Sequence, residues 1–268
     1  MAYADEGVGP AVLLIHGWAA HGGFFQDLRT RLKGQWRVLT PSLRGHPGSQ
    51  AGDAPLTIET LGQDIAELVE ALDLDRVAAI GWSMGAMALW AAAPRLAGRL
   101  SALVVEEMSP RVTNAADWPH GIGGAYEDAD VAGTLAEIRA DWPAYVARFA
   151  PRLFARGVST SLVTWAAEEM AKADNEAMAA FWRSMAMQDF RERLAAIDAP
   201  VLVVHGAESA IHPEGATKFV ARAASEGKHV VIPGAGHVPH LEAPELFFEH
   251  VEAFARFARP DHSRGVRS

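Results

Sequence analysis

The sequence predicts an α/β fold with a mostly parallel sheet, helices on both faces of the sheet and an inserted helical cap. Short apolar runs, typical of strands buried on both faces, alternate along the chain with helix-patterned segments. Such alternation predicts parallel strands joined by crossover helices. It is interrupted once, over residues 111–190, by a long stretch without strand-like runs.

The expected elements follow one another in a regular order. Strands are expected at residues 12–15, 36–39, 77–80, 100–105, 201–204 and 230–232. Helices are expected at residues 24–32, 57–72, 86–93, 214–224 and 244–257. In the second of these helices, apolar residues recur at helical spacing behind Thr57, a candidate N-cap.

The interruption divides the chain into two predicted parts. Residues 1–110 and 191–268 form the core, and residues 111–190 form the cap. Within the cap, helical stretches are expected at 135–155 and 161–187, rich in Trp, Phe and Met. Most of these aromatic side chains are expected to pack against the core, and a minority to line a pocket. The polar tail at 260–268 is expected to fray.

Composition excludes several classes of protein. The 268 residues are 50% hydrophobic and 21% charged, which is enough to bury a sizeable core. A net charge of −9 argues against general nucleic-acid binding. The absence of Cys excludes disulfides, thiol nucleophiles and Cys-ligated metals. No signal peptide and no apolar run of about 18 residues is visible, so a cytoplasmic protein without a membrane partner is expected.

One motif, Gly81-Trp82-Ser83-Met84-Gly85, carries the first indication of chemistry. It lies between an expected strand and an expected helix, the context in which a strained turn exposes a serine hydroxyl. Glycines on both sides give this turn room, and the N-terminus of the following helix favours developing negative charge. The motif alone also fits a glycine-rich turn with an incidental serine.

A serine nucleophile needs a base, and His237 is the best candidate. It follows the last expected strand, so parallel topology brings it to the same sheet edge as Ser83. His240, three residues later, is its rival. An oxyanion hole needs two N–H donors, which we expect from the backbone of Met84 and of Trp18.

Three motifs together resemble those of the α/β-hydrolase family. They are His16-Gly17-Trp18, Gly81-Trp82-Ser83-Met84-Gly85 and Gly236-His237. The resemblance covers nearly the whole chain and implies a serine, histidine and acid set that needs no metal or organic cofactor. The family sheet has eight strands, but residues 1–10 leave room for at most one short strand before the first apolar run.

The position of the acidic residue in the expected catalytic set departs from the family pattern. The family usually places Asp three residues after the glycine that closes the penultimate strand, but here Ser209 follows Gly206 at that spacing. A serine cannot supply the charge that supports the base. Glu107, at the end of the strand after the serine motif, is the favoured replacement, followed by Glu106 and then Glu208. Each of them also fits a solvated loop carboxylate.

Such a set catalyses acyl transfer, most often ester hydrolysis, so a carboxylic ester hydrolase acting on a small-molecule or carrier-linked ester is expected. Another hydrolase activity, on aryl or short-chain esters, lactones or C–C bonds, is one alternative. A non-catalytic binding protein with a decayed site is the other.

Four arginines in the cap, Arg139, Arg148, Arg152 and Arg156, suggest an anionic partner. The last three are spaced i, i+4, i+8, so one helix would place them on one face, although a solvated face is equally consistent. With the other motifs they resemble the pimeloyl-[acyl-carrier protein] methyl ester esterases of biotin synthesis. That resemblance implies arginines that dock an acidic acyl carrier protein.

Overall fold

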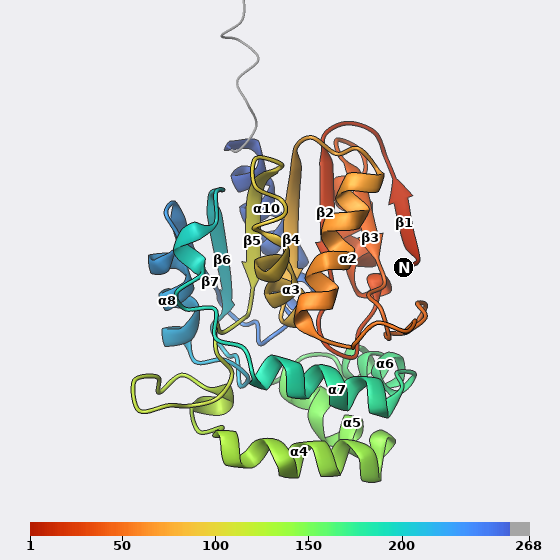
Figure 1. The fold of residues 1–268 in the computed structure, drawn as a ribbon, viewed down its shortest axis with the longest axis vertical. Coiled ribbons are helices and arrows are strands. Elements are labelled where there is room, and N and C mark those ends of the chain that lie inside the picture. The colour runs from red at the N-terminus through yellow and green to blue at the C-terminus, as the bar shows by residue number, and fades with distance from the viewer. Residues whose placement is uncertain (258–268) are drawn as a thin grey trace, which may run out of the picture.

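The structure of the protein, a computed structural model, describes residues 1–257. The tail at 260–268, which was expected to fray, lies outside the described residues. A mostly parallel sheet forms the centre of the molecule, with helices on both of its faces (Figure 1).

Seven strands of the described chain make up this sheet. They are β1 (Tyr3–Glu6), β2 (Ala11–Ile15), β3 (Arg37–Pro41), β4 (Val77–Trp82), β5 (Leu100–Glu106), β6 (Val201–Gly206) and β7 (Gly227–Ile232). Their order is β1-β3-β2-β4-β5-β6-β7, and only β1 runs antiparallel to its neighbour. All six predicted strands are present, and β1 occupies the short segment at the start of the chain. Since β2, β4 and β6 are buried along their whole length, their apolar runs reflect cover on both faces.

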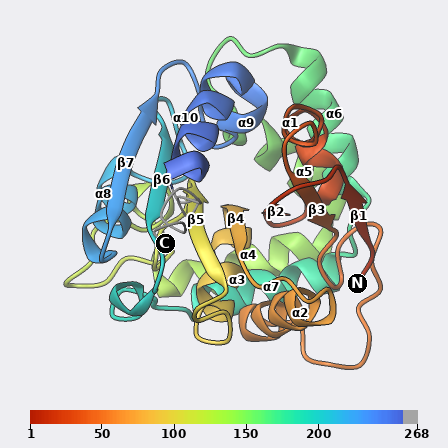
Figure 2. The same ribbon diagram turned by 90° about the horizontal axis from the view of Figure 1, so that it is seen from above.

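The core helices lie between consecutive strands, except for the last two, which both follow β7. They are α1 (Gln26–Leu32), α2 (Ile58–Ala71), α3 (Met84–Ala92), α8 (Glu214–Ala223), α9 (Pro239–Glu242) and α10 (Pro244–Phe257). Figure 2 shows α1 and α10 over one face of the sheet and α2 and α3 over the other. The predicted cap of α2 is confirmed, because the Thr57 hydroxyl accepts the Thr60 N–H at 3.1 Å.

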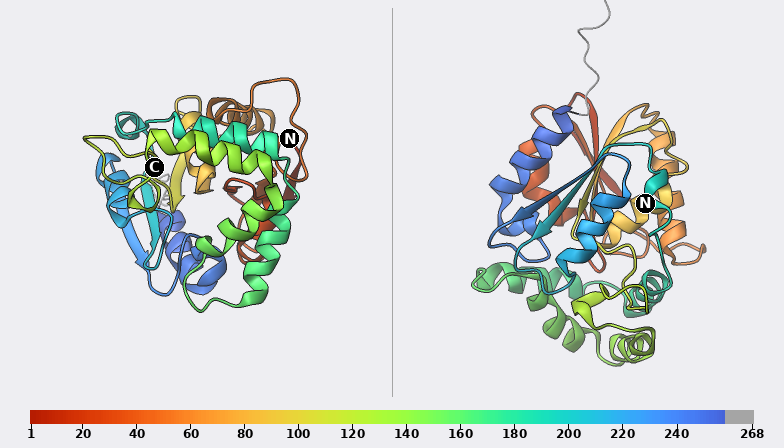
Figure 3. Two further views of the ribbon diagram at one scale, coloured as in Figure 1. Left: turned by 90° about the horizontal axis from the view of Figure 1, so that it is seen from below. Right: turned by 90° about the vertical axis from the view of Figure 1, so that its left-hand side faces the viewer.

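Four helices lie between β5 and β6 and cover one end of the sheet (Figure 3). They are α4 (Asp128–Ala140), α5 (Trp142–Phe149), α6 (Thr160–Ala171) and α7 (Asn175–Ala186). The predicted helical stretches at 135–155 and 161–187 are confirmed as helical, but each is broken into separate helices. Asp141 accepts the Ala144 N–H at 3.0 Å and starts α5 anew, and Asp174 does the same for Ala177 at 2.8 Å. No helix in residues 1–257 combines the length and apolar character needed to cross a bilayer.

Aromatic side chains join these helices to the core. The ring of Trp18, just after β2, contacts four aromatic rings with centroid distances of 5.0–6.1 Å: those of Trp142, Tyr145, Phe149 and Trp182. Its indole N–H donates to the Met178 carbonyl at 2.9 Å. Most aromatic residues of the predicted cap therefore serve packing, as expected, while a few also reach a cavity.

Candidate active site

Ser83 occupies a strained turn between β4 and α3. Its backbone has φ 53° and ψ −124°, a conformation that side-chain-bearing residues rarely adopt. A Cβ on Gly81 would lie 2.6 Å from the Ala86 nitrogen, and one on Gly85 would collide with the carbonyl of Ile15. Both glycines are thus required by close backbone approach, and the turn is built around the serine.

We expect Gly85→Ala to lower the free energy of unfolding by at least about 2 kcal/mol, because rigid backbone atoms fill the space of the new methyl group. Gly133→Ala is the matched control: Gly133 is exposed in α4, and a Cβ added there would meet no atom within 4 Å. It should stabilise the protein by about 0.5–1 kcal/mol. Urea denaturation of both variants measures the difference, and equal stabilities would contradict this account of the turn.

His237 is buried in the turn between β7 and α9. Its Nδ1 lies 3.3 Å from Oε2 of Glu107, and its backbone N–H donates to the Leu153 carbonyl at 2.7 Å. The Trp82 indole N–H donates to the carbonyl of His237 at 2.8 Å. Glu242 accepts N–H groups from the residues on either side of His237, at 2.9 and 3.1 Å. The backbone contacts hold the turn in place, and the contact with Glu107 orients the imidazole ring.

Glu107 directly follows β5 and is fully buried. Its backbone has φ 52°, another strained position. Its carboxylate accepts the Gly206 N–H and the Ser209 hydroxyl, each at 2.7 Å. Nδ1 of His205 lies 2.5 Å from Oε1, although its orientation is not that of a hydrogen bond. Burial alone would raise the pKa of Glu107, but its contacts with His205 and His237 outweigh burial and lower the pKa to about 2. The group is therefore ionised near neutral pH.

Ser209 binds Glu107, the favoured candidate for the acid. It stands where the family usually has Asp, and its hydroxyl donates to the Glu107 oxygen that faces His237. Glu107 follows β5, the neighbour of β6, and its carboxylate thus lies beside Ser209, the position that usually carries the Asp side chain. Glu208, the third candidate, is exposed, and its side chain forms no hydrogen bond or ion pair within residues 1–257.

Glu106 and His240 form a separate buried pair. Both Glu106 oxygens lie 2.9 Å from the His240 Nδ1, and one also accepts the His240 backbone N–H at 2.9 Å. The rings of Phe25 and Trp82 lie against the His240 ring, with centroid distances of 4.6 and 5.3 Å. His240, the predicted rival of His237, is not among the residues that line the cavity beside Ser83.

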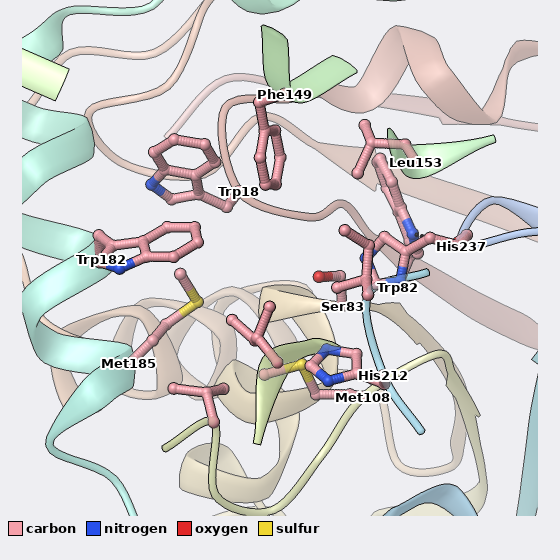
Figure 4. Close-up of a pocket in the computed structure, with 13 residues that line it drawn as sticks. Trp18, Trp82, Ser83, Met108, Phe149, Leu153, Trp182, Met185, His212 and His237 are labelled. Atoms are coloured by element: carbon pink, nitrogen blue, oxygen red, sulfur yellow. Dashed lines mark hydrogen bonds between the residues drawn. The ribbon is translucent and has the colours of Figure 1, made fainter. Parts of the chain in front are cut away.

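A largely apolar cavity lies between the core and the helices inserted between β5 and β6 (Figure 4). Thirteen residues line it: Trp18, Trp82, Ser83, Met108, Val112, Ile122, Phe149, Leu153, Trp182, Met185, Ile211, His212 and His237. Ser83 and His237, which are far apart in the sequence, both line this cavity.

Two histidines near Glu107 and the cavity, His205 and His212, were missed by the sequence analysis. Neither belongs to a motif, and their place around the end of β6 was the only signal that the sequence offered.

Comparisons with known proteins decide the family. A model described as "Alpha/beta hydrolase family" matches residues 12–250. This chain belongs to the α/β-hydrolase family. The membership confirms the predicted fold class and the resemblance drawn from the three motifs.

Individual relatives cover almost the whole of this α/β hydrolase. A pimeloyl-[acyl-carrier protein] methyl ester esterase of Neisseria meningitidis serogroup C is 30% identical, covering 95% of this chain and 94% of its own. A thermophilic esterase from Thermogutta terrifontis superposes with a TM-score of 0.85 at 27% identity, over 97% of this chain and 94% of its own. An esterase from Exiguobacterium antarcticum superposes with a TM-score of 0.87 at 22% identity, over 95% of this chain and 94% of its own. This likeness shows a shared fold.

The loop after β2 passes directly against the serine of the hydrolase. A Cβ on Gly17 would lie 3.2 Å from the Cβ of Ser83. His16 holds this loop, because its Nε2 accepts the Leu43 N–H at 2.8 Å while its Nδ1 lies 2.9 Å from the Gly17 carbonyl. Trp18 follows at once, and Met84 opens α3 on the other side of Ser83. The two expected oxyanion donors therefore belong to segments that flank the serine.

The four cap arginines do not form the single stripe expected from their spacing. After α5 ends at Phe149, the chain continues through a 3₁₀ turn, Ala150–Leu153, that contains a proline. Proline has no N–H to continue the α-helical bonds, so Arg148, Arg152 and Arg156 do not share one helix face. This prediction was wrong.

Two of these arginines are engaged in ion pairs. Arg139 pairs with Glu176 at 2.9 Å and Arg148 with Glu137 at 3.0 Å. Arg152 and Arg156 are exposed and form no ion pair with the residues that the structure describes. Arg152 directly precedes Leu153, which lines the cavity, and Arg156 follows after Phe154 and Ala155.

Proposed function

We propose that this α/β hydrolase is a serine carboxylesterase with Ser83 as nucleophile, His237 as base and Glu107 as acid. The observation that carries the proposal is the buried contact between Glu107 and His237 beside the cavity that Ser83 lines. The esterases among its relatives support ester hydrolysis as the reaction class.

The chemistry follows from these positions. His237 takes the proton of the Ser83 hydroxyl as it attacks the ester carbonyl, and Glu107 stabilises the imidazolium that forms. Backbone N–H groups of Met84 and Trp18 hold the developing oxyanion. His237 then gives its proton to the leaving alkoxide, and a water molecule hydrolyses the acyl-serine by the reverse sequence.

The finer proposal is that the substrate is the methyl ester of a pimeloyl chain carried on acyl carrier protein, in biotin synthesis. The name of the Neisseria relative supports it, and so does the apolar lining of the cavity, which suits an alkyl chain. Arg152 and Arg156 are the exposed cations that an acidic carrier would meet near the cavity. A cytoplasmic location belongs to this proposal.

Reversing these two charges tests the docking. We expect Arg152→Glu with Arg156→Glu to lower kcat/KM for the carrier-linked methyl ester by about tenfold or more, because the variant repels an acidic partner. Turnover of a p-nitrophenyl ester should not change. Arg139→Glu is the matched control, since that arginine is already paired with Glu176. Unchanged carrier-linked turnover in the double variant would refute docking at this site.

Complementation tests the substrate. The gene should restore growth without biotin to a strain that lacks its pimeloyl-carrier methyl ester esterase. Good activity on p-nitrophenyl esters without complementation would point to another ester, lactone or C–C substrate. No turnover of any ester would favour a non-catalytic binding protein.

A further inference from the structure

His212 is a buried histidine on the cavity wall that the proposed mechanism does not use. It is 2% exposed and follows β6 on the loop that Ser209 holds, where the Ser209 hydroxyl oxygen lies 3.4 Å from the His212 backbone nitrogen. Its ring centroid lies 5.4 Å from that of His237. Figure 4 shows the His212 ring below Ser83, on the same side of the cavity as His237.

The His212 ring is unsatisfied. Its Nδ1 has no hydrogen-bond partner, and its Nε2 makes no hydrogen bond to any residue in the part of the chain that the structure describes. An unpaired buried polar group costs about 1–3 kcal/mol, so an apolar side chain would be more stable here unless something else binds the ring. Burial, reinforced by the positive charge that His237 can carry, lowers the pKa of His212 to about 3. The ring is therefore neutral near neutral pH and has one nitrogen that accepts a hydrogen bond.

Few other cavity side chains can bind a polar atom. The three indole N–H groups already donate, at 2.8–2.9 Å, to the Met178 carbonyl, the His237 carbonyl and the Tyr126 hydroxyl. Seven of the remaining lining residues have side chains without a strong hydrogen-bonding group: Met108, Val112, Ile122, Phe149, Leu153, Met185 and Ile211. Only Ser83, His237 and His212 are left, and Ser83 is blocked once it carries the acyl group.

The second half of the reaction needs a placed water molecule. A water in a confined site needs two or more polar partners, and His237, which takes its proton, supplies one. A water that bridges one nitrogen of each ring requires those nitrogens to be within about 5.6 Å, twice an ordinary hydrogen bond. Ring centroids 5.4 Å apart are compatible with that bridge.

We propose that His212 holds the hydrolytic water against the acyl-serine, as a second partner beside His237. The inference rests on the proposed serine-esterase function. The water oxygen bonds to the acyl carbon while His237 removes one of its protons. The bond between that carbon and the Ser83 oxygen then breaks, and His237 returns the proton to Ser83. His212 accepts a hydrogen bond from the other O–H of the water and is itself unchanged.

Two variants separate this role from a structural one. His212→Leu removes the hydrogen-bonding ring, whereas His212→Gln keeps a side chain that can bind water. With a p-nitrophenyl ester, the burst of nitrophenol reports acylation and the steady state reports deacylation when that step is slow. We expect kcat of His212→Leu to fall about 10- to 100-fold, while kcat/KM, which reports acylation, stays within about threefold.

The accompanying readouts sharpen the test. KM should fall with kcat in His212→Leu, the burst should persist, and acyl-enzyme should accumulate by mass spectrometry. His212→Gln should recover about tenfold of the lost kcat. The melting temperature of His212→Leu should not fall, because the substitution removes an unpaired buried nitrogen.

Other results would overturn the proposal. An unchanged kcat in His212→Leu, or a kcat/KM that falls in proportion to kcat, would mean that His212 does not act on the water. Failure of the wild-type protein to form an acyl-enzyme would overturn the esterase function and this role together. Normal acylation with unaffected turnover in His212→Leu would overturn the role of His212 alone.

Discussion

Replacing Glu107 with glutamine is expected to lower kcat by about 10³- to 10⁴-fold, the loss typical of a triad acid. The amide keeps the size of the side chain but removes the charge that stabilises the His237 imidazolium. It also presents either a donor or an acceptor to Nδ1, so the required tautomer is no longer enforced. KM for a small p-nitrophenyl ester should change little, because Glu107 is fully buried and does not line the cavity. Steady-state kinetics measures both constants.

Two controls make the assignment of the acid specific. Glu208→Gln should leave kcat within about twofold, since that side chain is exposed. Ser209→Asp in the Glu107→Gln background should recover part of the activity, because the Ser209 hydroxyl lies 2.7 Å from the Glu107 oxygen that faces His237. A large loss in Glu208→Gln, with Glu107→Gln active, would show that the acid is Glu208 instead.

Replacing Ser83 with alanine is expected to lower kcat by about 10⁴-fold or more, the largest effect of any single substitution in this protein. No other hydroxyl lines the cavity within the described chain, so no neighbouring side chain can replace the nucleophile. The fold should persist, because the elbow is determined by its glycines and its backbone. The loss is measured as hydrolysis of a p-nitrophenyl ester by protein with an unchanged melting temperature.

Labelling by a fluorophosphonate gives an independent readout for Ser83. The wild-type protein should gain one covalent label at this residue, and Ser83→Ala should gain none. Ser209→Ala is the matched control, since Ser209 donates to Glu107 but does not line the cavity. It should still be labelled, at a rate lowered by about tenfold or less, the effect of losing one hydrogen bond to a charged group. Labelling of Ser83→Ala would exclude Ser83 as the nucleophile.

Much of the fold was predictable because buried segments require a recognisable pattern of apolar residues. Strands covered on both faces, such as β2 and β4, must be wholly apolar, so residues 12–15 and 77–80 were identified correctly. The turn around Ser83 was equally predictable, since its geometry requires glycine at two positions. His237 followed from topology, because parallel strands bring their carboxyl ends to one edge.

The helices between β5 and β6 were less predictable. Their apolar residues continue at helical spacing through the breaks, and only local capping by Asp141 and Asp174 divides them. The prediction that the cap arginines share one helix face was wrong for a similar reason. It assumed an unbroken helix from Arg148 to Arg156, but α5 ends at Phe149.

The sequence by itself determined the α/β architecture, the serine turn and the edge of the sheet on which the site lies. These features depend on periodicity and on backbone geometry, which are local properties. Only the tertiary structure decided which carboxylate reaches His237 and that Ser209 binds it, and only the structure brought His212 beside the same cavity. Those pairings join residues 25 to 130 positions apart in the chain, so they depend on how neighbouring strands end rather than on any local pattern.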